Sequence, residues 1–419
     1  MAVASQLEGS LAVARTVARC RPQVICAYPI TPQTHIVEAL SRIVASGELA
    51  PCEFVNVESE FAAMSVAIGA SATGARAYTA TASQGLLYMA EALFNASGLG
   101  LPIVMTVANR AIGAPINIWN DHSDAMALRD CGWVQLYATS NQEAADMHVQ
   151  AFRLAERCSL PVMVCMDGFV LTHAVEPVEL PEQEPVDAYL PPFRPRQVLD
   201  PEDPVTMGAL VGPEAYTEVR YLAHAKQGEA LDEIPVLATD FAARFGRASG
   251  GLIETYRCEG ADTVIVALGS VFGTLQELVD ERRAQGARLG ALAIKSFRPF
   301  PVGELRAALS STRGVIVLER AFSVGVGGIV TGDVRAALAG VDVDTATVIA
   351  GLGGRAITRS SLHAMLDRHE QGALQPVHFL DLDIDLVERE LARHRDGERG
   401  GPHAENILRE LGIVAAGPV

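Results

Sequence analysis

The sequence predicts an α/β protein in which two domains are each built on a parallel sheet covered by helices. Three observations support this prediction. Short apolar runs alternate with helical stretches along the chain, which is typical of parallel strands joined by helices. A chain of 419 residues is long enough for two or three domains at roughly 150 residues each. A proline-rich interruption at 177–204 separates the two stretches in which the alternation occurs.

The first domain is expected over residues 1–176, and its first buried strand lies at 24–27. That strand ends in Tyr28-Pro-Ile-Thr-Pro32, whose prolines cannot continue a ladder and force an extended turn. Further strands are expected at 54–57, 77–81, 103–108 and 162–166, and helices at 61–73 and 86–96. Ligands of parallel sheets bind at the carboxyl ends of the strands. The turns that follow these strands are therefore where a site is expected.

Residues 177–258 are expected to form a Pro-rich linker and an insert. Eight prolines lie between Pro177 and Pro204, which is typical of a semi-rigid linker, and the polar stretch at 205–257 is expected to be poorly defined. A second α/β domain is expected at 259–390, with strands at 263–268, 289–294 and 314–318, a helix at 272–285 and another after 325–328. A charged tail at 391–419 is expected to pack loosely or to wrap a partner.

Composition and charge argue against several classes of protein. The net charge is −17, from 33 basic and 50 acidic residues, which disfavours binding to nucleic acid or to an anionic membrane. The most apolar run, at 98–108, is shorter than the ~20 residues that cross a bilayer, and the N-terminus lacks the basic region of a signal peptide. A cytoplasmic location is therefore expected. The seven cysteines form no Cys-x-x-Cys pair, so any metal cluster is expected on another chain.

Common catalytic motifs are also absent from the sequence. It contains no P-loop, no Gly-x-Ser-x-Gly elbow and no His-Glu-x-x-His. The glycine-rich segments at 325–328 and 351–354 do not match the dinucleotide fingerprint. Asn120-Asp-His-Ser-Asp124 contains two carboxylates and an imidazole, which could ligate a metal. We expect instead a polar loop that caps nearby backbone, because no third ligand group of suitable spacing follows.

Three side chains remain as candidates, each near the end of a predicted strand. The prolines around Thr31 would hold its hydroxyl at the mouth of the sheet, or would only fix a turn. Glu60 lies just before an apolar helix, and a carboxylate near a helix N-terminus is stabilised. If that carboxylate is buried, it needs a partner such as a protonated heterocycle nitrogen. Arg110 suits bidentate recognition of a carboxylate, the alternative being an internal salt bridge.

Together these segments resemble the α subunit of 2-oxoacid:ferredoxin oxidoreductases, most closely the pyruvate type. The matching segments of the first domain are Tyr28-Pro-Ile-Thr-Pro32, Val57-Glu-Ser-Glu-Phe61, Thr81-Ala-Ser-Gln-Gly-Leu86, Asn109-Arg-Ala-Ile112, Asn117-Ile-Trp-Asn-Asp-His-Ser-Asp124 and Asp167-Gly-Phe169. Those of the second domain are Ala267-Leu-Gly-Ser270, Phe297-Arg-Pro-Phe-Pro301 and Gly351-Leu-Gly-Gly-Arg355. The resemblance implies a thiamine-diphosphate-binding, pyrimidine-side domain followed by a transketolase C-terminal-like α/β domain.

The resemblance also implies roles for single residues. Glu60 is expected to hydrogen-bond the pyrimidine N1′ of thiamine diphosphate, which favours the imino tautomer that takes the proton from thiazolium C2. Arg110 and the Thr31 hydroxyl are expected to hold the substrate carboxylate. Tyr28 and Ile118 are expected to line the substrate pocket. No residue of this chain is expected to bind a metal.

The activity implied is the CoA-dependent oxidative decarboxylation of pyruvate, or the reverse synthesis, with electrons passed to ferredoxin. A β subunit is expected to hold the diphosphate, Mg²⁺ and a [4Fe-4S] cluster, alongside γ and ferredoxin-like δ subunits. The absence of a Gly-Asp-Gly diphosphate motif from this chain agrees with that division and argues against a free-standing transketolase-like enzyme. Two alternatives stay open: the same reaction on a branched-chain 2-oxo acid or an aryl glyoxylate, and a non-catalytic scaffold subunit.

Overall fold

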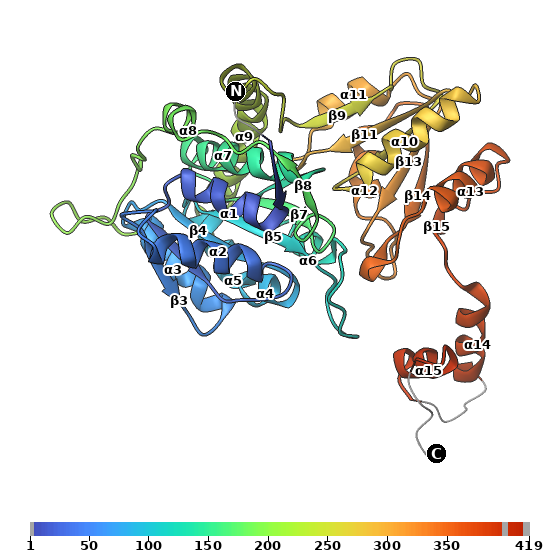
Figure 1. Ribbon diagram of the computed structural model, residues 1–419, viewed down its shortest axis with the longest axis horizontal. Coiled ribbons are helices and arrows are strands. Elements are labelled where there is room, and N and C mark those ends of the chain that lie inside the picture. The colour runs from blue at the N-terminus through green and yellow to red at the C-terminus, as the bar shows by residue number, and fades with distance from the viewer. Residues whose placement is uncertain (1–3, 396–400, 414–419) are drawn as a thin grey trace.

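In the computed structural model, which describes residues 4–395 and 401–413, a seven-stranded sheet forms the centre of the first domain (Figure 1). Its strand order is β12-β6-β7-β5-β4-β2-β3, and only β12 runs antiparallel to its neighbour. The strands are β2 (Val24–Ala27), β3 (Glu53–Asn56), β4 (Ala77–Thr81), β5 (Val104–Asn109), β6 (Val134–Tyr137), β7 (Val162–Asp167) and β12 (Ser296–Arg298). The predicted parallel-sheet domain is confirmed.

Helices cover both faces of this sheet, as the alternation predicts. One core contains residues of α1 (Gly9–Arg19), α2 (Thr34–Ala45) and α7 (Asn141–Cys158). The other contains residues of α3 (Glu60–Ala72), α4 (Ser83–Tyr88), α5 (Ala90–Gly98) and α6 (Ser123–Ala127). Two further strands, β1 (Ser5–Glu8) and β8 (Val175–Val178), pair antiparallel as a separate ribbon.

The region predicted as a linker and insert contains regular structure. It includes α8 (Gln183–Tyr189) and the 30-residue helix α9 (Tyr216–Phe245). The Tyr189 hydroxyl donates to the Leu237 carbonyl at 3.0 Å. Buried residues of both helices lie in the same core as those of α1 and α7, so both helices pack in the first domain. The expectation of a linker outside the domain is therefore wrong for these segments. Four residues of α9 are buried at helical spacing, all from its midpoint onward: Ala230, Ile234, Leu237 and Phe241.

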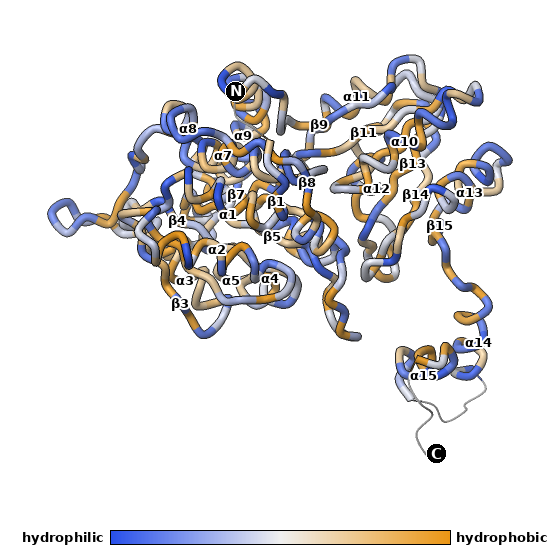
Figure 2. Tube along the Cα trace, in the orientation of Figure 1, coloured by the Kyte–Doolittle hydropathy of each residue, from blue (hydrophilic) through white to orange (hydrophobic). Residues whose placement is uncertain are grey.

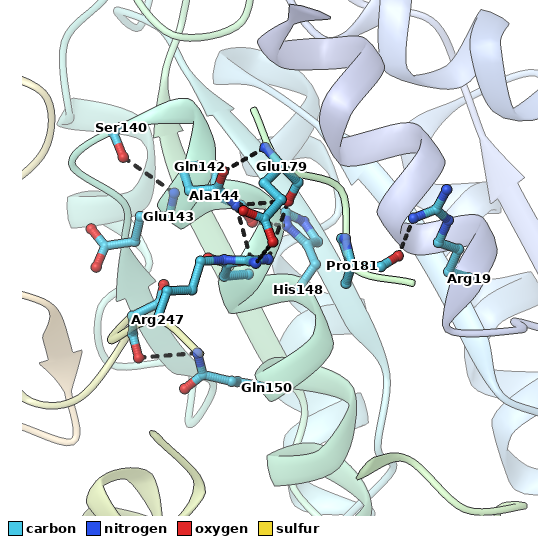
Figure 3. Close-up of polar contacts among 12 residues, drawn as sticks. Arg19, Ser140, Gln142, Glu143, Ala144, His148, Gln150, Glu179, Pro181 and Arg247 are labelled. Atoms are coloured by element: carbon cyan, nitrogen blue, oxygen red, sulfur yellow. Dashed lines mark hydrogen bonds and ion pairs between the residues drawn. The ribbon is translucent and has the colours of Figure 1, made fainter. Parts of the chain in front are cut away.

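Arg247, just after α9, fastens this region to α7 (Figure 3). Its guanidinium makes two hydrogen bonds to Asp146, at 2.7 and 2.9 Å, and one to the Glu179 carboxylate at 3.0 Å. Gln142 joins the same group, since its amide donates to the Glu179 carbonyl at 3.1 Å. Burial works against the Arg247 cation, but Asp146 outweighs it and raises the pKa of Arg247. The start of the second domain is thereby tied to the first.

A six-stranded sheet of order β15-β14-β13-β10-β11-β9 forms the second domain, and only β9 is antiparallel. Its strands are β9 (Ile253–Tyr256), β10 (Thr263–Ala267), β11 (Leu289–Ile294), β13 (Gly314–Glu319), β14 (Asp344–Ile349) and β15 (Val377–Phe379). Its helices are α10 (Val271–Ala284), α11 (Val302–Leu309), α12 (Val330–Ala337), the short 3₁₀ turn η1 (Leu352–Gly354) and α13 (Arg359–Glu370). Figure 2 shows apolar residues along the central strands. The sheet starts at β9, ahead of the boundary expected at 259.

The tail contains α14 (Ile384–Arg395) and α15 (His403–Glu410), which pack on each other. Figure 1 shows this pair standing apart from both domains. A contact between the tail and a partner stays a prediction. Within residues 4–395 and 401–413, no helix combines the length and the apolar character needed to span a bilayer.

Candidate active site

Four loops at the carboxyl edge of the first sheet bring the candidate residues together. The turn after β2 carries Thr31, and the loop after β3 leads into Glu60 at the start of α3. The loop after β4 leads into Ser83 and Gln84, and Arg110 directly follows β5. This is the edge at which the sequence predicts a site.

Glu60 is a buried carboxylate without a hydrogen-bond donor in the described part of the chain. Ser59 caps α3 by accepting from the Ala62 N–H at 3.2 Å, which places Glu60 in the first turn with 8% of its surface exposed. A side chain at Gly85 would come within 2.6 Å of both Glu60 Oε1 and Thr81 Oγ1. The Thr81 hydroxyl is also buried without a partner. The Glu60 carboxylate and the Thr81 hydroxyl therefore both pack closely against the backbone of Gly85.

Arg110 is a buried cation whose side-chain partners are neutral. Its Nη1 donates to the Thr31 carbonyl at 2.6 Å and its Nη2 to Gln84 Oε1 at 2.8 Å, while its Nε is buried without a partner. Only 8% of its surface is exposed, and no carboxylate pairs with the guanidinium among the described residues. Burial lowers the pKa of Arg110, against the opposing charges of Asp124 and Glu60. A buried cation of this kind needs an anion from outside the chain.

Asp124 holds the backbone of this site in place. Its carboxylate accepts from the backbone N–H groups of Ser83 at 2.9 Å and Arg110 at 3.0 Å, and from the Asn109 amide at 2.9 Å. Burial raises the pKa of Asp124 to about 6, although these hydrogen bonds oppose the shift. The prediction that this polar segment caps nearby backbone is confirmed. Sequence reasoning missed Ser83, Gln84 and Asp124 as parts of the site.

The remaining predicted residues lie around the mouth of the site. Thr31 is exposed, and its carbonyl accepts a hydrogen bond from Arg110. The role predicted for its hydroxyl, to hold the substrate carboxylate, stays a prediction. Tyr28 and Ile118 are also exposed, at 39% and 41%. Their roles as pocket residues stay predictions.

An apolar loop extends from the site between β5 and α6 (Figures 1 and 2). Its exposed side chains include Ile116, 84% exposed, and half-exposed Trp119. The second domain holds the loop between these two residues, because Asn117 Nδ2 donates to the Gly353 carbonyl at 3.1 Å. A side chain at Gly354 would come within 2.4 Å of the Trp119 Cβ. The glycines at 351–354 therefore serve close packing between the domains.

Asp167, at the end of β7, joins the two domains from the same edge. Its carboxylate contacts His122 Nε2 at 2.6 Å, the Arg320 guanidinium at 3.0 Å and the Ser270 backbone N–H at 2.9 Å. Burial would raise the pKa of Asp167, but Arg320 and His122 outweigh it and hold the pKa well below its usual range. The loop that carries Asp124 is thereby connected to the second domain.

One group of potential metal ligands stands beside the site. Ligand atoms of Glu8, His35 and His173 lie within 4.8 Å of one another. His35 Nδ1 and Glu8 Oε1 are 2.6 Å apart, a hydrogen bond. The imidazole rings of His35 and His173 lie 4.6 Å apart between centroids and are tilted by 35°. We interpret the group as a hydrogen-bonded surface cluster.

A cavity of about 500 Å³ lies at the opposite end of the first sheet. Its lining includes Gly132, Trp133 and Leu160, which precede β6 and β7. It is therefore remote from Glu60 and Arg110, and we assign the chemistry to the carboxyl edge.

The fold and site are those of a thiamine-diphosphate-dependent oxidoreductase that acts on 2-oxo acids. Two protein-family models match the chain: "Pyruvate flavodoxin/ferredoxin oxidoreductase, thiamine diP-bdg" over residues 15–235, and "Pyruvate:ferredoxin oxidoreductase core domain II" over residues 261–362. The chain belongs to the pyruvate:ferredoxin oxidoreductase family, in which it corresponds to the α subunit. The family and fold class predicted from the sequence are confirmed.

Similar proteins agree with this assignment. Pyruvate synthase subunit PorA of Methanosarcina barkeri is 48% identical over 390 residues, which cover 91% of this chain and 97% of that protein. Ketoisovalerate oxidoreductase subunit VorA of Pyrococcus horikoshii is 42% identical over 364 residues, 86% and 92% of the two chains. A solved 2-oxoglutarate:ferredoxin oxidoreductase from Magnetococcus marinus aligns with a TM-score of 0.64 at 20% identity. That alignment covers 89% of this chain and 65% of the other, less than two thirds, and shows the fold alone.

Proposed function

We propose that this α subunit takes part in the CoA-dependent oxidative decarboxylation of pyruvate, or its reverse, by contributing an acid to thiamine diphosphate and a cation to the substrate. One observation supports the proposal above the others. Glu60 and Arg110 are each 8% exposed and lie at the same edge of the sheet, yet neither has an oppositely charged hydrogen-bond partner in the described chain. Charges are rarely buried in this way unless a ligand completes them.

The residues around Glu60 fit the pyrimidine side of thiamine diphosphate. Its carboxylate is free to accept a hydrogen bond from a ring nitrogen, and the Cβ that Gly85 lacks lets this carboxylate lie directly against the α4 backbone. Thiamine diphosphate supplies the electron sink for cleavage of the bond between the carboxyl and carbonyl carbons. In this proposal Glu60 holds a proton between its carboxylate oxygen and the ring nitrogen.

In this proposal Arg110 and the Thr31 hydroxyl receive the carboxylate of the 2-oxo acid. The guanidinium offers further N–H groups after its bonds to Thr31 and Gln84, and its burial excludes the water that would weaken an ion pair. We favour pyruvate because the PorA relative is more similar than the VorA relative, at 48% against 42% identity. A branched-chain 2-oxo acid is the alternative substrate.

Partner chains complete the site in this proposal. The apolar tip formed by Ile116, Ile118 and Trp119 is exposed beside Arg110, and exposed apolar groups at a site mark contact surfaces. The relatives' names also describe subunits. We assign the diphosphate, Mg²⁺ and a [4Fe-4S] cluster to a β subunit, electron transfer toward ferredoxin to further γ and δ subunits, and the whole complex to the cytoplasm.

The test is Glu60→Gln in the complex purified with its partner chains. We expect deuterium exchange at thiazolium C2 and turnover of pyruvate to fall together, because the amide cannot hold the proton that the carboxylate holds. Glu58→Gln, an exposed acid of the same loop, is the matched control and should leave both unchanged. Wild-type exchange and turnover in Glu60→Gln would contradict the proposal and favour a scaffold. A panel of 2-oxo acids decides between pyruvate and a branched-chain substrate.

A further inference from the structure

Gln84 is the residue of the site whose role neither the family match nor the sequence explains. It is the second residue of α4 and is partly buried. Its Oε1 accepts from Arg110 Nη2 at 2.8 Å, and the Ser83 hydroxyl contacts the same oxygen. Gln84 therefore touches the cation that the proposed function assigns to the substrate.

Because Gln84 is neutral, no carboxylate of the described residues bonds the Arg110 guanidinium, and the charges of Asp124 and Glu60 act on it only from a distance. Both side-chain hydrogen bonds of the guanidinium go to uncharged oxygens, on Thr31 and Gln84. Elsewhere in the chain buried arginines pair with acids: Arg76 contacts Glu156 at 2.5 Å, and Arg320 contacts Asp167 at 3.0 Å. A carboxylate at position 84 would form the same kind of pair with Arg110 and would remove the site for an anion.

The amide nitrogen of Gln84 stays available. Its oxygen must face Arg110, because the reversed amide would direct an N–H group at a guanidinium that can only donate. Within residues 4–395 and 401–413, Gln84 Nε2 donates no hydrogen bond, and a Cβ on Gly113 would come within 2.7 Å of it. The backbone at Gly113 therefore confines an amide that has two N–H groups to offer.

We propose that Gln84 is a positioning residue for the substrate carboxylate. Its oxygen orients the Arg110 guanidinium, its neutrality preserves the charge of that group, and its nitrogen donates a second hydrogen bond to the bound carboxylate. This inference rests on the proposed function and identifies the ligand class of the site as a small carboxylate held by Arg110 and Gln84 together.

The test compares Gln84→Glu with Gln84→Met in the assembled complex. Gln84→Glu keeps the shape of the side chain but pairs with Arg110 and repels the substrate, so the KM for pyruvate should rise roughly 100-fold or more. Gln84→Met removes the hydrogen bonds without adding charge, and the KM should rise roughly 3- to 10-fold. The affinity for oxamate, an unreactive isostere of pyruvate, should fall in the same order. Deuterium exchange at thiazolium C2 should stay at the wild-type rate in both variants.

The outcomes separate this inference from the proposed function. An unchanged KM and unchanged oxamate affinity in Gln84→Glu, with a raised KM in Arg110→Lys, would overturn only the role of Gln84. An unchanged KM for pyruvate in both Gln84→Glu and Arg110→Lys would overturn the substrate site itself. Equal losses of exchange and of oxamate affinity in both position-84 variants would show a structural role and also contradict the inference. If Gln84→Glu does not assemble, the oxamate affinity of Gln84→Met decides alone.

Discussion

Single residues define the site through charges that the chain leaves without a counterpart. Arg76 shows the contrast, because both its Nε and Nη2 atoms bond the Glu156 carboxylate, at 2.5 and 3.1 Å. Arg110 is just as buried but bonds only a carbonyl and an amide. Since desolvating an ion costs several kcal/mol, an unpaired arginine of this kind is the best physical sign of an anionic ligand.

Arg110→Lys tests whether this unpaired arginine binds the anionic substrate. We expect the KM for pyruvate to rise roughly 10- to 100-fold, because an ammonium cannot make the planar fork that holds a carboxylate. Exchange at thiazolium C2 should stay close to wild type, since Arg110 does not contact the ring nitrogen in this proposal. Arg129→Lys, at a partly exposed arginine, is the control. Equal losses of exchange and of substrate capture would identify Arg110 as a structural residue.

We expect the buried imidazole of His148 to make the stability of the folded chain depend on pH. Its Nδ1 lies 2.6 Å from the Ala144 carbonyl and its Nε2 lies 2.6 Å from Thr106 Oγ1, and burial lowers the pKa of His148 to about 4. The unfolded chain takes up the proton near pH ~6.5. The contribution of neutral His148 to the free energy of unfolding is therefore complete above that pH. It is lost as the pH falls to about 4, a loss of about 3 kcal/mol.

The corresponding measurement is the thermal unfolding midpoint of the complex between pH 7 and 4. The midpoint of the wild type should fall with acidification, and His148→Gln should show a shallower slope because the variant has no group that titrates there. His224→Gln, at an exposed histidine, should keep the wild-type slope. Parallel slopes for all three proteins would remove His148 from this role.

The placement of Glu60 and Arg110 near strand ends could be predicted because residue type and the end of each apolar run are both visible in the sequence. The supporting residues could not. Asp124 lies 41 residues from Ser83 and 14 from Arg110 along the chain, yet it binds the backbone of both. Only the fold brings such segments together, so Gln84 and Asp124 carried no signal of their own beyond the family match.

At the scale of elements, prediction succeeded where strands are buried on both faces and failed where polar residues interrupt the pattern. The strand β11 was predicted with its observed bounds because it is entirely apolar apart from Gly290. The strand β6 was missed because Gln135 breaks its short apolar run, although this buried amide donates to the Ala125 carbonyl at 3.1 Å. The helix α9 was missed because only its C-terminal half is buried and Pro235 lies within it.

Phe241 should account for much of the stability of α9. Its ring stacks on Phe245 at 4.2 Å between centroids and meets Tyr189 at 5.9 Å. Phe241→Ala should cost about 3–5 kcal/mol of unfolding free energy, whereas Val219→Ala on the exposed half of the helix should stay within about 0.5 kcal/mol of wild type. Thermal unfolding of the complex measures both. Equal midpoints would mean that α9 packs elsewhere.

For the whole molecule, the joint between the domains centres on one carboxylate. Asp167 binds His122 from the first domain and both Arg320 and Ser270 from the second. These contacts of Asp167 could not be predicted from the sequence, because the three partners lie 45, 103 and 153 residues away along the chain.

Asp167→Asn leaves Arg320 buried without its acid. Removing one member of a buried pair costs about 3–5 kcal/mol, so the unfolding midpoint should drop, and the linker between the domains should become more sensitive to limited proteolysis. Asp130→Asn is the control, since that exposed acid lies 3.8 Å from Arg129 and such pairs contribute about 0–1 kcal/mol. An unchanged midpoint in Asp167→Asn would show that other contacts hold the domains.

The strand β12 also limits how this chain can be divided in evolution or in the laboratory. It lies beyond β11 in the sequence, yet Ser296 pairs with Leu136 at the rim of the first sheet. A fragment ending before residue 259 would lose that strand and expose the β6 backbone, an open template on which strands of other molecules can add. Recombination that exchanged only one half of the gene would have to preserve this pairing, so the two halves are expected to be inherited as a unit.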